Sequence, residues 1–150
     1  MASRRVRNRY EPAAVCGQSR RAGTSTCRDL LEEWRRGDSA WFVTWSILYE
    51  FLRVRTHPRV FPVPIGLTQA REWIDALLAG QDDNVLVATD RHAGVLEQLV
   101  SRNPGLRGNP VHDLHIATLM MEHGVTEIRT ADTDFHQFKF LRVVNPLVST

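Results

Sequence analysis

Residues 109–135 read NPVHDLHIATLMMEHGVTEIRTADTDF, and this stretch decides the fold class of the chain. Its first part predicts a helix over residues 111–123, because apolar side chains recur at helical spacing and Gly124 follows as a C-terminal cap. Its second part predicts a short buried strand over residues 126–129. A helix that leads directly into a short apolar strand is typical of α/β domains.

The same alternation extends outward on both sides of this stretch. Proline- and glycine-containing loops over residues 57–64 and 103–109 separate the segments. We expect helices over residues 28–34, 46–55, 68–78 and 93–100, and strands over residues 40–43, 84–87 and 141–144. Helices that alternate with short apolar strands predict an α/β domain with a mostly parallel sheet.

Length and composition are those of a single globular domain. The chain has 150 residues, of which 43% are hydrophobic and 24% charged, and these values argue against overall disorder. No apolar run approaches the roughly 20 residues of a membrane span, and no apolar stretch follows the N-terminal arginines as in a signal peptide. We therefore expect a cytoplasmic protein with no membrane association. The two cysteines, Cys16 and Cys27, match neither a disulfide framework nor a paired-cysteine zinc site.

Positive charge is concentrated at the N-terminus. Residues 1–28 hold seven arginines and a single acid, Glu11, so the rest of the chain is net acidic. We expect residues 1–27 to be a poorly ordered basic segment, although such an arm could also contact nucleic-acid phosphates. The periodic sequence begins near Arg28, and residues 28–150 are predicted to form the folded domain.

Two acids lie on the apolar faces of their predicted helices. These are Glu50 and Asp113. A buried carboxylate without a partner costs several kcal/mol, so each needs a cation, a helix terminus or a metal ion. Asp113 could instead be a first-turn acid that the helix dipole favours, and Glu50 could pair with Arg53 or Arg55.

A third acidic position follows the strand predicted at residues 126–129. Asp132 and Asp134 lie where ligands bind in parallel α/β sheets, although a turn with a helix cap before Phe135 is the alternative. Clustered carboxylates repel one another, and a divalent cation with a preference for oxygen ligands, Mg²⁺ or Mn²⁺, relieves that repulsion. Such ions position a phosphodiester and activate a water. The acids therefore indicate metal-assisted phosphodiester hydrolysis.

Other chemistries have less support in the sequence. Histidines occur in the same region without the spacing of a zinc motif, and we interpret them as surface or supporting residues: His112, His115, His123 and His136. An α/β module whose acids accept a phosphoryl group would need a lysine after a late strand, and Lys139 is poorly placed for that role.

Three blocks of the chain carry a family resemblance. They are WSILYEFLRV at residues 45–54, GNPVHDLHIA at 108–117 and TADTDF at 130–135, and the closing LRVVNPL at 141–147 adds to them. In order and spacing they resemble the PIN-domain nucleases of the VapC type, the toxins of toxin–antitoxin pairs. The resemblance covers about residues 28–147. It implies a PIN-like three-layer α/β/α fold, Mg²⁺- or Mn²⁺-dependent RNA cleavage, homodimerisation and neutralisation by a VapB-type antitoxin.

The resemblance also implies a role for each acid. Glu50, Asp113 and Asp132 match metal-coordinating catalytic acids, and Asp134 matches a frequent auxiliary catalytic acid. Thr130 matches a hydroxyl that helps to orient the cluster.

The N-terminus departs from the family pattern. The family begins with a central strand that supplies a further acid, and residues 1–27 contain no such motif. Glu11 has about the right separation from Glu50, but its neighbours do not form an apolar strand. We expect the first central strand to be missing or degraded, for example by a frameshift that regains frame near Arg28. The alternative to an active endoribonuclease is therefore a catalytically impaired remnant that only binds antitoxin or RNA.

Overall fold

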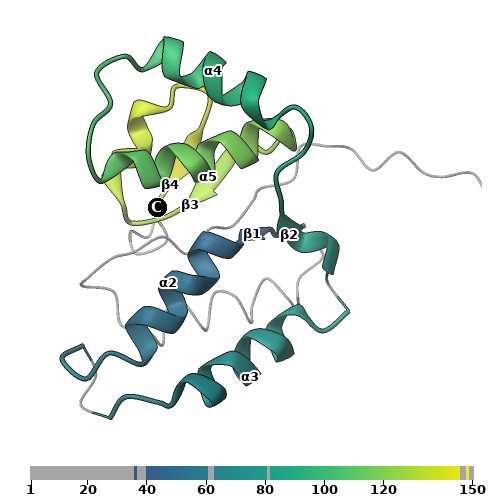
Figure 1. Cartoon of the computed structure of the whole chain (residues 1–150), viewed down its shortest axis with the longest axis vertical. Coiled ribbons are helices and arrows are strands. Elements are labelled where there is room, and N and C mark those ends of the chain that lie inside the picture. Colours follow the sequence, from purple (N-terminus) through teal and green to yellow (C-terminus); the bar gives the residue numbers. More distant parts are fainter. Residues whose placement is uncertain (1–35, 37–39, 61–62, 81, 146–147, 149–150) are drawn as a thin grey trace, which may run out of the picture.

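Helices and short strands alternate through the computed structural model, which describes residues 36, 40–60, 63–80, 82–145 and 148 (Figure 1). This alternation confirms the predicted α/β class. The helix predicted over residues 28–34 and the basic segment 1–27 lie outside the described residues. The elements are β1 (Val43–Thr44), α2 (Trp45–Arg55), α3 (Leu67–Leu78), η1 (Asp82–Asn84), β2 (Val85–Leu86), α4 (His92–Arg102), α5 (Pro110–Glu122), β3 (Glu127–Arg129), η2 (Thr133–Gln137) and β4 (Arg142–Val144).

The strands pair in parallel but form two separate sheets of two strands each. Val43 of β1 lies opposite Val85 of β2, and Ile128 of β3 lies opposite Val143 of β4. Parallel pairing was predicted, and a continuous sheet is not formed by the described strands. The expectation that the family's first central strand is missing or degraded concerns residues outside the described part of the chain, and it stays a prediction.

The first half of the fold joins β1, β2, α2 and α3. Thr44 ends β1 and begins α2, because its buried Oγ1 accepts a hydrogen bond from the backbone N–H of Ile47 at 3.4 Å. The strand predicted at residues 40–43 therefore reduces to Val43–Thr44. The rings of Phe51 on α2 and Trp73 on α3 stack with their centres 4.4 Å apart. Beneath them lies a core of Trp41, Val43, Leu48, Ile74 and Leu77.

The second half is built around α5, which lies between α4 and the β3–β4 pair (Figure 1). Most of the side chains of α5 are buried, and they pack with residues of both neighbouring layers: Leu99, Ile128, Phe135 and Phe138. Gly124 ends the helix with a φ of +68°, a conformation that glycine adopts without strain. The predicted C-terminal cap of this helix is thereby confirmed.

The core of the second half extends across to the first half. Leu86 of β2 belongs to the same buried cluster as the α5 side chains, and Phe42 and Ile47 pack against it. None of the helices in the described part of the chain is long and apolar enough to cross a membrane.

Ile128→Ala tests the importance of the core around α5. Ile128 is 0% exposed at the centre of β3, so the substitution should lower the free energy of unfolding by about 2–5 kcal/mol. Val100→Ala is the matched control, because Val100 is 49% exposed on α4 and its loss should change stability by no more than about 0.5 kcal/mol. Urea unfolding followed by circular dichroism measures both, and equal effects would contradict this description of the core.

Candidate functional site

Three carboxylates converge at one end of the second half of the fold. Asp113, Asp132 and Asp134 each present an oxygen, and these oxygens all lie within 4.8 Å of one another. Asp113 comes from the first turn of α5, and the other two come from the segment that connects β3 to η2. The tertiary structure thus brings together three of the acids that the sequence singled out.

The start of α5 fixes the position of Asp113. Gly108 turns the chain with a φ of +72°, and Pro110 occupies the first turn, where its missing N–H costs nothing. The backbone N–H groups of Val111 and His112 donate to the carbonyls of Gly108 and Asn109, each at 3.0 Å. Asp113 therefore lies where the helix dipole favours a carboxylate, as in the first-turn alternative.

Thr130 and the turn after β3 fix Asp132. The backbone N–H of Thr130 donates to the Val144 carbonyl at 2.9 Å, and its buried Oγ1 accepts from the backbone N–H of Asp132 at 3.0 Å. Oδ1 of Asp132 then accepts from the backbone N–H of Asp134 at 2.9 Å. Asp132 is thus the predicted cap of a short helix, and the capping bond uses only one of its two carboxylate oxygens.

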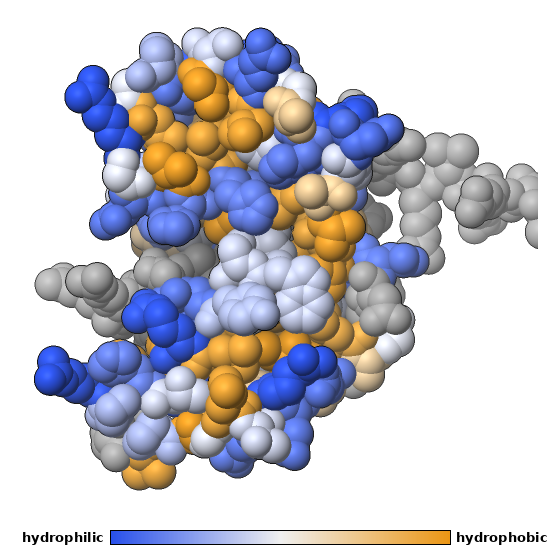
Figure 2. Space-filling model, viewed as in Figure 1, coloured by the Kyte–Doolittle hydropathy of each residue, from blue (hydrophilic) through white to orange (hydrophobic). Residues whose placement is uncertain are grey.

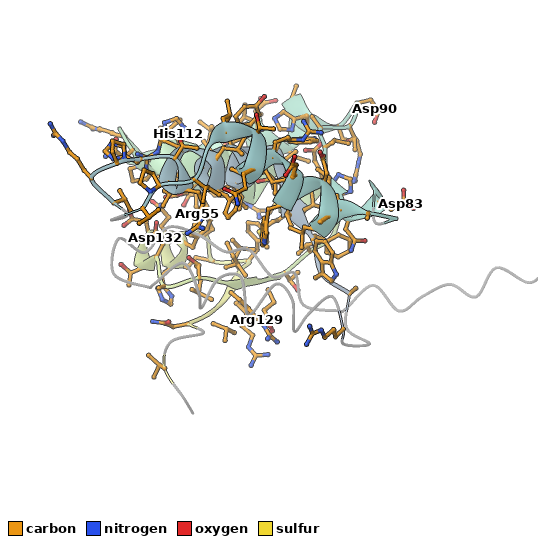
Figure 3. The ribbon with its side chains drawn as sticks, turned by 90° about the horizontal axis from the view of Figure 1, so that it is seen from below. Arg55, Asp83, Asp90, His112, Arg129 and Asp132 are labelled. Atoms are coloured by element: carbon orange, nitrogen blue, oxygen red, sulfur yellow. The ribbon has the colours of Figure 1, made fainter. Side chains whose placement is uncertain are left out.

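The pKa of Asp113 is affected by the other carboxylates of this cluster. Burial and the negative charges of Asp132 and Asp134 raise the pKa of Asp113 to about 6, and neighbouring His112 opposes the shift. A carboxylate that resists ionisation among like charges is stabilised in its charged form when a cation enters the cluster. The labelled His112 and Asp132 lie at the same end of the molecule (Figure 3).

Glu50 is not part of this group of three carboxylates. It lies on α2, where Oε2 accepts from Nε of Arg53 at 2.8 Å and Oε1 binds a second guanidinium nitrogen of the same side chain. This is the local pairing that the sequence offered as the alternative, because residues three apart on a helix are neighbours. The expected convergence of Glu50 with Asp113 and Asp132 is not found, and its role as a metal ligand stays a prediction.

A buried acid that the sequence analysis missed lies at the other end of α5. The side chain of Glu122 is fully buried, and its Oε1 accepts from the backbone N–H and the hydroxyl of Thr89 at 2.9 and 2.7 Å. Its Oε2 lies 2.6 Å from Nδ1 of His92. Burial opposes ionisation, but these hydrogen bonds lower the pKa of Glu122 overall. Glu122 follows the core residue Leu119 by three residues, and this spacing placed it on the buried face of the helix, which was the signal available in the sequence.

A histidine pair adjoins this buried acid. The rings of His92 and His115 meet edge to face with their centres 5.8 Å apart. Burial and the nearby His92 lower the pKa of His115, which favours its neutral form. The neutral imidazole is the form that accepts hydrogen bonds and binds metals.

A known protein family matches most of the chain. The PIN domain family matches residues 15–141. The match begins ahead of residue 28, where the sequence placed the start of the folded domain, and that boundary stays a prediction.

Individual relatives give the same assignment. Ribonuclease VapC43 of Mycobacterium tuberculosis is 35% identical over 120 residues, which cover 80% of each chain. Ribonuclease VapC37 of the same organism is 35% identical over 107 residues, 68% of this chain and 69% of its own. VapC ribonuclease Mb2897 of Mycobacterium bovis is 35% identical over 80% of each chain. From the family match and these identities, the chain belongs to the PIN-domain family, among the members of the VapC type.

Proposed function

We propose that this chain is a divalent-metal-dependent endoribonuclease. The observation that carries the proposal is the convergence of Asp113, Asp132 and Asp134, whose oxygens lie within 4.8 Å of one another. Relatives that match most of the chain are named ribonucleases, and this supports RNA as the substrate. The cluster occupies the carboxyl end of β3, which is where parallel α/β sheets bind their ligands.

The donor set fits Mg²⁺ or Mn²⁺. All three ligands are carboxylates, and hard oxygen donors select these ions over zinc or copper. Asp113, Asp132 and Asp134 would hold the ion. Burial and, after it, the charges of Asp132 and Asp134 raise the pKa of Asp113 to about 6, and the ion would offset both effects. When bound, the ion would position the phosphodiester, activate a water and stabilise the leaving oxygen.

The surrounding residues keep the carboxylates in place. The Thr130 hydroxyl holds the backbone of Asp132, and Asp132 in turn holds the backbone of Asp134. Thr130 is therefore a positioning residue in this proposal. Glu50 accepts hydrogen bonds from Arg53 on both of its carboxylate oxygens and lies outside the group of three converging aspartates.

The pairing of Glu50 with Arg53 favours a second candidate function. A site with three acids, and no match in residues 1–27 for the family's first acid, would bind metal more weakly than a complete one. Such a protein would be a catalytically impaired remnant that only binds an antitoxin or RNA. Measured RNA cleavage distinguishes the two candidates.

We also propose that a cognate VapB-type antitoxin binds this protein and that the protein assembles as a homodimer. We place its action on RNA in the cytoplasm. The similarity to VapC proteins supports the antitoxin as a partner. Figure 2 shows apolar surface on both halves of the molecule, including the half that holds α2 and α3. Large side chains that are exposed there include Trp45, Tyr49, Val63 and Leu67, and exposed apolar patches of this kind mark protein interaction surfaces.

Asp113→Asn tests the activity. In the presence of Mn²⁺ it should reduce cleavage of a fluorescent single-stranded RNA by roughly 100-fold or more, because the removed charge holds the ion that stabilises the transition state. Asp83→Asn is the matched control and should leave the rate unchanged, because Asp83 is exposed and lies at the opposite end of the molecule from Asp132 (Figure 3).

Two results would contradict the proposal. Cleavage that survives Asp113→Asn would remove the assigned site, and cleavage that persists in excess chelator would remove the metal. If the unmodified chain binds RNA or antitoxin and cleaves nothing, the impaired remnant is the correct reading.

The same substitution makes a prediction about stability and pH. The pKa of Asp113 is raised to about 6 from an ordinary value of 3.8, so the folded state holds this proton more tightly than the unfolded state. Ionisation therefore destabilises the metal-free fold increasingly as the pH rises through about 6. Asp113→Asn should raise Tm in chelator at about pH 7.5, and the gain should shrink as the pH falls towards about 4.5.

Thermal unfolding across this pH range measures the effect, with Asp83→Asn again as control. Added Mn²⁺ should raise Tm of the unmodified chain and leave that of Asp113→Asn nearly unchanged. A gain that is independent of pH, or that grows on acidification, would show that Asp113 is not the strained acid of the cluster.

A further inference from the structure

A row of solvent-accessible imidazoles begins beside the carboxylate cluster and continues away from it along α5. His112 directly precedes Asp113 in the chain, and His115 follows His112 by one helical turn, so the two exposed histidines are neighbours on the helix surface. The ring of His92, the first residue of α4, meets the ring of His115 edge to face, with centres 5.8 Å apart. The row therefore connects the end of α5 that carries Asp113 with the start of α4.

Electrostatic interactions join this row to the carboxylate cluster. His112 opposes the rise in the pKa of Asp113 that burial and the charges of the other two aspartates cause. Burial and, after it, the charge of His92 lower the pKa of His115, and His112 adds to this effect. His112 thus lies close to both the cluster and His115, and the row is continuous with the proposed nuclease centre.

Hydrogen bonds to Glu122 fix the far end of the row. The lowered pKa of Glu122 keeps its buried carboxylate ionised, so Nδ1 of His92 donates to Oε2 at 2.6 Å. The guanidinium of the next residue, Arg91, binds the backbone carbonyl of Glu122, and the arginine side chain stays exposed to solvent. The row therefore ends beside a permanent positive charge whose position is fixed.

These groups have the chemistry that binds unpaired RNA. Three carboxylates repel a phosphodiester, so neighbouring groups have to supply the affinity for the strand. Histidine rings stack on the bases of single-stranded RNA, and arginine binds phosphate oxygens. The row offers both kinds of group directly beside the cluster.

From this geometry we infer that a surface formed by His112, His115, His92 and Arg91 binds the single-stranded RNA that leads out of the carboxylate cluster. The inference rests on the proposed function and specifies how its substrate is held. His115 is the central contact, because its exposed ring lies between the other two imidazoles and is free to stack on a base. These residues act on RNA affinity and not on the chemical step.

Fluorescence anisotropy of a labelled single-stranded RNA tests this surface, with the full-length chain in excess chelator so that binding is measured without metal-dependent cleavage. His115→Ala should weaken RNA binding at least about fivefold, because stacking on one base is lost. His115→Phe should keep most of the affinity, because a phenylalanine ring also stacks on bases. Arg91→Gln should weaken binding and reduce the slope of log affinity against log salt concentration by about 1, as expected for one phosphate contact.

His57→Ala and Arg71→Gln are matched controls, because His57 lies in the α2–α3 connection and Arg71 on α3, and both should bind RNA like the unmodified chain. With Mn²⁺ present, His115→Ala should raise KM for RNA cleavage and leave kcat nearly unchanged.

The two proposals fail in different ways. RNA binding that depends on His115 in a chain that cleaves nothing would support this surface and reject the nuclease activity. Equal RNA affinity in His115→Ala and the controls would overturn the inference even where cleavage depends on metal. Duplex RNA that binds as tightly as the single strand would also overturn it, and so would His115→Ala that converts a dimer to a monomer without changing RNA affinity, because the row would then be a protein interface.

Discussion

The burial of α5 between α4 and the β3–β4 pair is the constraint on which the rest of the structure depends. Nearly every apolar side chain of this helix is removed from water, and its packing partners come from several other elements. A helix fixed in this way holds both of its ends rigidly. One end carries Asp113 into the acidic cluster, and the other carries Glu122 into its hydrogen bonds with Thr89 and His92.

The two acids at the ends of α5, Glu122 and Asp113, differ in how their negative charge is stabilised. Glu122 is fully buried, and its hydrogen bonds keep it ionised. Asp113 is partly buried, and burial together with the negative charges of Asp132 and Asp134 raises its pKa to about 6. A satisfied acid stabilises the fold, whereas an unsatisfied cluster stores an unfavourable energy that a cation can release. This contrast separates a structural carboxylate from one suited to bind a ligand.

Side-chain packing connects the two separate strand pairs of the described residues. In the described residues β1 pairs only with β2, and β3 only with β4, while Leu86, Phe42 and Ile47 connect the halves through side-chain packing. Glu50 lies on α2 in one half, and the three converging aspartates lie in the other.

The sequence by itself determined the order of elements and most of the acidic site. Apolar periodicity predicted α2, α3, α4 and α5 to within one or two residues, because each amphipathic segment must bury one face locally. Asp113 was recognisable as a candidate site residue because it is an acid on the apolar face of its helix. Asp132 was recognisable because it directly follows a strand, where α/β sheets bind ligands. Only the tertiary structure decided that Glu50 lies outside the group of three aspartates, that Glu122 is buried, and that His92 meets His115. Contacts between distant segments depend on how whole elements pack, and no linear spacing encodes that packing.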